Sequence, residues 1–131
     1  MKFRYTRYGR DILRPVIPVE LIGRQTVPYE VLVDSGADIS IFDAQIGALA
    51  GIDVEAGEPS TLSGVTGTTE TFYIHKVTLM LDDVRFQTKI GFLPNMTPLG
   101  YGVLGQKGFF DIFIVKFDLL KEEIELKQRN K

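Results

Sequence analysis

The segment from Tyr29 to Ser40 reads Tyr-Glu-Val-Leu-Val-Asp-Ser-Gly-Ala-Asp-Ile-Ser and decides how the chain is interpreted. An apolar stretch typical of a buried strand runs directly into Asp34, which Ser35 and Gly36 follow. A carboxylate at the end of a buried strand is costly unless it is hydrogen-bonded. Because Gly36 has no Cβ, its N–H can approach the Asp34 carboxylate closely. The segment therefore predicts a carboxylate that its own loop fixes at a strand end.

Short apolar runs surround this segment, and they are rich in β-branched and aromatic residues, which favours strands over helices. Gly23 and the pair Asp82-Asp83 mark turns between such runs and predict hairpins. In the last predicted hairpin, Phe113, Val115 and Phe117 share one face because strand side chains alternate. The predicted strands are residues 16–22, 27–33, 70–81, 84–93, 112–118 and 124–127. The fold class predicted from this pattern is all-β.

Helix is expected only in short pieces. Asp43 is placed to cap a helix over residues 44–50, and Gly51 stands where a helix-terminating glycine belongs. Residues 106–110 predict one further helical turn. The sequence thus indicates one or two short helices within a single domain that spans residues 1–131.

The composition excludes several kinds of chemistry. The 131 residues include no cysteine, so a disulfide framework, a thiol nucleophile and a thiolate zinc site are ruled out. The single histidine, His75, lies in a predicted strand, and we interpret it as structural and not as a base or a ligand. A formal net charge of −2 gives no general attraction to nucleic acid or to an anionic membrane. No apolar run approaches the roughly 18 residues that span a bilayer, and we expect a cytoplasmic protein with no membrane partner.

The Asp-Ser-Gly-Ala sequence at Asp34 resembles the Asp-Thr/Ser-Gly-Ala signature of aspartic proteases. Residues 15–127 as a whole resemble the retropepsin-like (retroviral-type) family. The hairpin before Asp34 and the short strand at residues 39–42 match that pattern, and the Gly-containing segment 62–68 falls where the family has its flap. Val103-Leu104-Gly105 resembles the family's second conserved element. The resemblance implies a small closed β-barrel-like acid protease fold.

The mechanism implied by the resemblance uses two aspartates that share one proton, because two adjacent carboxylates cannot both ionise. This chain has one Asp-x-Gly, at Asp34. The second carboxyl group is therefore expected from another copy, as an Asp34/Asp34′ dyad on the axis of a homodimer. The C-terminal hairpin is our candidate for the dimer sheet. No metal and no cofactor are expected.

The candidate site follows residue by residue from the same resemblance. The catalytic group is Asp34, Ser35 and Gly36, acting on a peptide or protein substrate as an aspartic endopeptidase. Asp38 matches a position that contacts substrate main chain or an intersubunit arginine in viral relatives. The expected substrate-binding residues are Ala37, Asp38, Ser63, Gly64, Val65, Thr66 and Gly67.

Two other functions are compatible with the sequence. The first is a catalytically inactive retropepsin-like module for peptide binding or dimerisation. The second is a small β-barrel that binds nucleic acid through its basic, aromatic N-terminus, which the slightly negative net charge disfavours. The segment 100–105 matches G-x-G-x-x-G, but the remaining chain cannot hold a βαβ unit, so we expect no dinucleotide site. The Thr-rich flap and the basic extension before Pro15 depart from the viral pattern.

Overall fold

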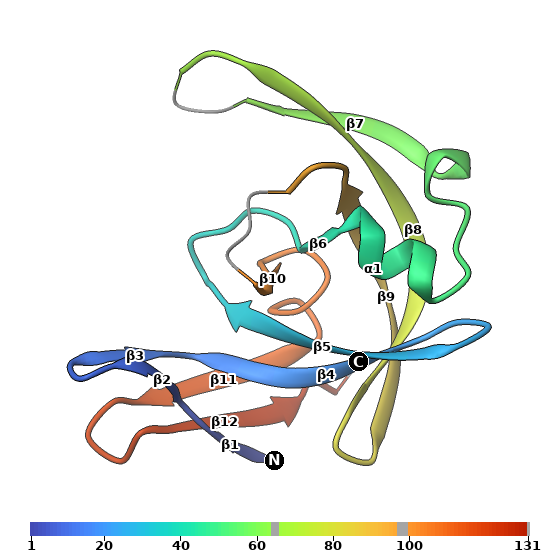
Figure 1. The fold of residues 1–131 in the computed structure, drawn as a ribbon. Coiled ribbons are helices and arrows are strands. Elements are labelled where there is room, and N and C mark those ends of the chain that lie inside the picture. Colours follow the sequence, from blue (N-terminus) through green and yellow to red (C-terminus); the bar gives the residue numbers. More distant parts are fainter. Residues whose placement is uncertain (64–65, 97–99, 131) are drawn as a thin grey trace.

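A computed structural model describes residues 1–63, 66–96 and 100–130, and in this part of the chain the fold is dominated by strands (Figure 1). Its strands are β1 (Lys2–Arg4), β2 (Thr6–Gly9), β3 (Ile12–Arg14), β4 (Val16–Ile22), β5 (Thr26–Val33), β6 (Ile41–Asp43), β7 (Glu58–Ser63), β8 (Thr69–Leu81), β9 (Val84–Leu93), β10 (Gly102–Leu104), β11 (Phe113–Asp118) and β12 (Glu123–Gln128). The short helix α1 (Ala44–Leu49) and the 3₁₀ turn η1 (Val54–Ala56) lie between β6 and β7. The all-β prediction is confirmed.

The main sheet closes on itself into a barrel. Its strand order is β4-β5-β10-β6-β9-β8-β7, and β4 also pairs with β8, so that Leu21 lies opposite Leu79. Alternate side chains of these strands point inward, as the period of a strand requires. Leu21, Val31, Leu79 and Leu81 are fully buried, and Phe92 fills the barrel beside them. Only β7 lies outside the closed ring, as the outer strand of a hairpin with β8.

The short helix α1 confirms the capping prediction. Asp43 accepts a hydrogen bond from the backbone N–H of Gln45 at 2.9 Å, which satisfies one of the free donors at the helix start. Gly51 ends the helix with a φ of +88°, a conformation that glycine adopts at little cost. Gly47 is buried against Phe92, where an added Cβ would lie 2.8 Å from the ring. The helix therefore closes one side of the barrel.

The N-terminus belongs to a second sheet, of order β1-β12-β11. Phe3 on β1 is buried with Phe113 and Ile124, which joins this sheet to the barrel core. Arg7 faces Glu122 of the C-terminal hairpin at 3.7 Å. The basic extension before Pro15, which departs from the viral pattern in sequence, contributes β1 to this terminal sheet. Burial of the Phe3 ring in the core stabilises β1 in this sheet, although charged residues stand on both sides of it.

The predicted helical turn at residues 106–110 is wrong. These residues form a series of turns, in which the N–H of Phe110 bonds to the carbonyl of Gly105 at 3.2 Å. Lys107 pairs instead with Ile39 as an isolated parallel bridge, and Gly108 has a φ of +100°. This tertiary pairing and the left-handed residue keep the segment out of a helix.

Candidate active site

Asp34 stands at the end of β5, where the chain leaves the barrel. Its backbone N–H donates to the carbonyl of Leu104 at 2.9 Å, which continues the parallel pairing between β5 and β10 by one residue. The side chain is half-buried. Two neighbouring strands therefore fix the position of this carboxylate before its own loop contributes anything.

The loop after Asp34 orients the carboxylate as the sequence suggested. The N–H of Gly36 donates to Asp34 Oδ1 at 2.9 Å, and the N–H of Ala37 donates to the Asp34 carbonyl at 3.1 Å. A Cβ on Gly36 would lie 3.2 Å from Asp34 Oδ1, so a side chain at this position would crowd the oxygen that is bound. Ser35 and Gly36 are exposed.

A second connection, residues 105–107, crosses this loop at close range. The N–H of Gln106 donates to the carbonyl of Ala37 at 2.8 Å, and its side-chain amide donates to the carbonyl of Ser35 at 2.9 Å. A Cβ on Gly105 would lie 2.6 Å from the Ala37 carbonyl and closer still to that of Ile39. Only glycine fits at the crossing, which explains why the Val-Leu-Gly sequence ends in Gly105.

Ser40 ties the two connections together and was missed by the sequence analysis. Its side chain is 1% exposed. The hydroxyl donates to the carbonyl of Lys107 at 2.9 Å and accepts from the N–H of Gly105 at 2.9 Å. The available signal was a polar residue between Ile39 and Ile41 in an otherwise apolar strand. A buried hydroxyl there had to find partners from another segment.

The Asp34 carboxylate faces a cleft of about 740 Å³ that lies between this loop and strand β7. Of the predicted substrate-binding residues, Ala37, Asp38 and Ser63 line the cleft beside Asp34. Thr66 and Gly67 are exposed and are not among the lining residues, whereas Gly64 and Val65 lie outside the described residues. Lining residues that the sequence analysis did not assign to the site are Ile39, Ile41, Ser60, Thr61, Leu62, Phe72, Ile74, Met96, Val103 and Lys107.

His75 has a structural role in this arrangement. Its Nε2 lies 2.7 Å from the carbonyl of Val54 in η1, and its ring meets Phe92 edge-on with centroids 5.7 Å apart. A Cβ on Gly57 would lie 2.5 Å from the same nitrogen. The imidazole thus holds the connection after α1 against β8, and it does not line the cleft that contains Asp34.

The segment 100–105 also has a structural explanation. Gly102–Leu104 is strand β10, which pairs with β5 on one side and with β6 on the other. A Cβ on Gly102 would lie 2.6 Å from the ring of Tyr29.

The described residues include no helix long and apolar enough to cross a lipid bilayer.

The closed barrel has one carboxylate held by its own loop, and the β7–β8 hairpin lies across the cleft from it. This arrangement is a retropepsin-like fold. Comparison with protein families gives a match to the aspartyl protease family over residues 17–107. This match covers well over half of the chain, so the protein belongs to the aspartyl protease family. A search of curated proteins returned no match.

Solved structures agree with this fold. A retropepsin-like aspartic protease from Rickettsia conorii is similar with a TM-score of 0.62 and 14% identity, covering 96% of this chain and 88% of that one. The EIAV protease complexed with the inhibitor HBY-793 is similar with a TM-score of 0.51 and 22% identity, covering 77% of this chain and 88% of that one. At these identities the likeness concerns the fold.

Proposed function

We propose that this protein is an aspartic endopeptidase whose active site forms between two copies of the chain, with an Asp34/Asp34′ dyad. The observation that carries the proposal is the Asp34 carboxylate, held by Gly36 at the edge of an open cleft. Asp38 also lines the cleft, but it joins the crossing through its backbone carbonyl, which accepts from the Lys107 N–H at 3.0 Å, and not through its carboxylate. The second carboxyl group is therefore assigned to a second chain.

The reaction requires the two carboxyl groups to share one proton. The ionised group takes a proton from a bound water, and the resulting hydroxide attacks the carbonyl carbon of the scissile peptide bond. The protonated group donates its proton to the carbonyl oxygen. The tetrahedral intermediate then collapses, the C–N bond breaks, and the amine leaves with a proton from the dyad. The pair titrates as one unit with two apparent pKa values.

The shape of the chain supports a two-fold assembly. The connection after Asp34, the β2–β3 hairpin and the turn between β11 and β12 all lie on the left side of Figure 1. Large apolar side chains are exposed on these two hairpins, as is unusual for a surface without a partner. They are Tyr8, Ile12, Ile114, Phe117, Leu119 and Leu120. We propose that a second copy covers this side and brings the two Asp34 loops together.

The substrate would lie extended in the cleft. Strand β7 ends the strand order of the main sheet, so one of its edges is unpaired within the described residues. An extended peptide can add main-chain hydrogen bonds to such an edge. Leu62 and Ser60, which line the cleft from β7, would then contact alternate side chains of the peptide.

The decisive experiment compares the purified protein with its Asp34→Asn variant on an unfolded protein substrate between pH 4 and 7. Asparagine keeps an acceptor for the Gly36 N–H but cannot exchange the proton, so we expect cleavage to fall by about 10²–10⁴-fold. Asp83→Asn, in the β8–β9 turn, makes the same charge change away from the cleft and should retain activity. A statine-type inhibitor should block the wild type.

Equal cleavage by wild type and Asp34→Asn would contradict the assignment of Asp34. Cleavage by neither protein would favour the inactive peptide-binding or dimerisation module. Sedimentation at micromolar concentration tests the assembly independently, because a strictly monomeric and active protein could not use a shared dyad.

A further inference from the structure

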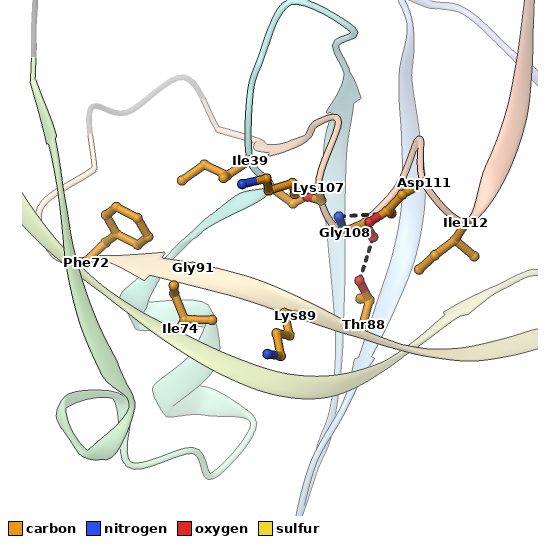
Figure 2. Close-up of a pocket in the computed structure, with 11 residues that line it drawn as sticks. Ile39, Phe72, Ile74, Thr88, Lys89, Gly91, Lys107, Gly108, Asp111 and Ile112 are labelled. Atoms are coloured by element: carbon orange, nitrogen blue, oxygen red, sulfur yellow. Dashed lines mark hydrogen bonds between the residues drawn. The ribbon is translucent and has the colours of Figure 1, made fainter.

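A second cavity, of about 530 Å³ (Figure 2), shares part of its lining with the active-site cleft. The two cavities have Ile39, Phe72, Ile74 and Lys107 in common. They are therefore adjacent compartments separated by a shared set of side chains. The second cavity, here called the side pocket, extends between strand β9 and the turns at residues 107–112. Its volume is within the range of pockets that hold small ligands, about 300–1,000 Å³.

Two glycines leave space for the side pocket. Its lining is apolar because hydroxyl groups on its floor are hydrogen-bonded within the protein. A Cβ on Gly91 would lie 2.6 Å from the ring of Phe72, and one on Gly108 would lie 2.7 Å from the carbonyl of Lys89. Thr88 Oγ1 donates to the Gly108 carbonyl at 2.6 Å. The hydroxyl of Ser40, which also lines the pocket, is paired with Lys107 and Gly105, so the pocket favours an apolar group.

The rim of the side pocket is positively charged. Lys89 and Lys107 line it, and Lys76 stands directly opposite Lys89 in the β8–β9 ladder, so these two side chains leave the same face of the sheet. Like charges in that position repel each other. Across residues 1–63, 66–96 and 100–130, none of these three lysines forms an ion pair. Asp111 also lines the rim, and its Oδ1 accepts from the Gly108 N–H at 3.1 Å.

We propose that the side pocket is a substrate-anchoring site that binds a bulky apolar side chain of the peptide, with an acidic residue of the same peptide at the lysine rim. This inference rests on the proposed function, because its occupant is the peptide that lies in the adjacent cleft. Side chains two residues apart point the same way from an extended peptide. The preferred segment therefore has an apolar anchor and a carboxylate two positions away, as in Phe-x-Glu.

The test measures binding without cleavage, on the Asp34→Asn variant of the 131-residue chain with ¹³C-labelled isoleucine methyl groups. Ile112 lines the side pocket and not the cleft, whereas Ile41 lines the cleft and not the side pocket, so the two methyl signals report on the two compartments separately. The probes are ten-residue peptides that contain Phe-x-Glu, Phe-x-Lys or Ala-x-Glu. We expect Phe-x-Glu to shift both signals, and Ala-x-Glu to shift Ile41 alone.

Charge is tested with Lys89→Glu, an exposed position on β9. This variant should bind Phe-x-Glu about fivefold more weakly and Phe-x-Lys more tightly, since pairs at partly exposed sites contribute modestly. Arg85→Glu makes the same charge change on the same strand and should leave both affinities unchanged. The Phe-x-Lys peptide poses the same question to the unaltered side pocket, so the test does not depend on the folding of one variant.

The outcomes separate this inference from the proposed function. If Ile112 does not shift with any peptide, or if Phe-x-Glu and Phe-x-Lys bind equally well, the side pocket is not an anchoring site, whatever the protein cleaves. If Ile112 shifts with the expected preference while wild type cleaves nothing, the anchoring site stands and the endopeptidase proposal fails.

Discussion

The loop crossing at Asp34 and the terminal sheet differ in how far one chain alone completes their contacts. At the crossing, Ser35, Ala37, Asp38 and Ser40 are hydrogen-bonded to residues 105–107, and Ser40 is buried with both contacts of its hydroxyl made. In the terminal sheet, Phe117 is 40% exposed and Leu120 is 97% exposed. The crossing is finished within one chain, whereas the hairpin end leaves apolar surface in water.

This difference assigns separate physical roles to the two regions. A self-contained crossing holds the Asp34 carboxylate in one geometry before any partner or substrate arrives, which is how a site avoids reorganisation during the reaction. An uncovered hairpin end gains free energy when a second copy removes it from water. Substitutions at the crossing should therefore change the stability of the chain, and those at the hairpin end should change its assembly.

The largest effect is expected from Gly105→Ala. The new methyl group would meet the backbone carbonyls of Ala37 and Ile39, which cannot move without breaking the crossing. Overpacking typically costs about 1–3 kcal/mol, and we expect about 3 kcal/mol here because the atoms in the way belong to the backbone. Chemical denaturation should show this loss, and Gly67→Ala, whose Cβ would meet nothing within 4 Å, should cost only the strain of its positive φ. Equal losses for both variants would mean that the crossing is not tightly packed.

Ser40→Ala should have the next largest effect. It removes the acceptor for the Gly105 N–H, which would be left buried without its partner. Such a loss costs about 1–3 kcal/mol. Ser35→Ala is the matched control, because Ser35 is exposed and its hydroxyl makes no hydrogen bond within the described residues. Thermal unfolding of the two variants measures the difference, and a Ser40→Ala protein as stable as Ser35→Ala would show that the hydroxyl is dispensable.

A substitution at the end of the β11–β12 hairpin should weaken dimerisation and leave the stability of the isolated chain unchanged. Phe117→Glu places a charge on the surface that we assign to a second copy. Truncating or charging a central apolar contact typically costs about 1–2 kcal/mol of association, so sedimentation should show roughly tenfold weaker dimerisation. Thr78→Glu, on β8 and away from this hairpin, is a control for added charge. Unchanged dimerisation would move the interface to another face.

The same two regions show what the sequence could and could not reveal. The strands β4 and β9 begin and end where their apolar periodicity predicted, and Asp43 caps α1 as expected, because these features depend on local patterns. The helical turn at 106–110 failed because a distant partner, Ile39, decides its conformation. The predicted apolar face of the last hairpin was correct in its alternation only. Phe113 is buried in its own core and Phe117 is exposed, a split that depends on where the sheet leaves the barrel.

The residues of the candidate site also divide into those defined by local sequence and those defined by contacts between distant segments. Asp34 and Gly36 form the predicted hydrogen bond, since three consecutive residues suffice to define it. Ser40 and Lys107 could not be assigned from sequence, because their contacts join segments that lie 67 residues apart. The side pocket was equally hidden, since its lining residues come from segments that lie far apart in the sequence.

The smallest expected effect concerns Tyr29, a residue of β5 that packs on the ring of Phe42 with centroids 5.1 Å apart. Burial raises the pKa of its phenol above the usual value, although the backbone hydrogen bond from Asp43 acts in the opposite direction. The folded state therefore keeps the proton to a higher pH than the unfolded state. The stability linked to this proton is fully present below pH 10, the ordinary pKa, and is lost as the pH rises through the folded-state value.

Tyr29→Phe should separate that proton from the packing of the ring. At pH 7 the variant should differ from wild type by less than about 1 kcal/mol, because the lost hydrogen bond from the Asp43 N–H is long, at 3.4 Å. Between pH 9 and 11 the wild type should lose more stability than the variant, as measured by urea unfolding at each pH. Parallel curves would show that Tyr29 ionises equally well in both states. The barrel around the half-buried Tyr29 would then be more open to water than the contact of its ring with Phe42 indicates.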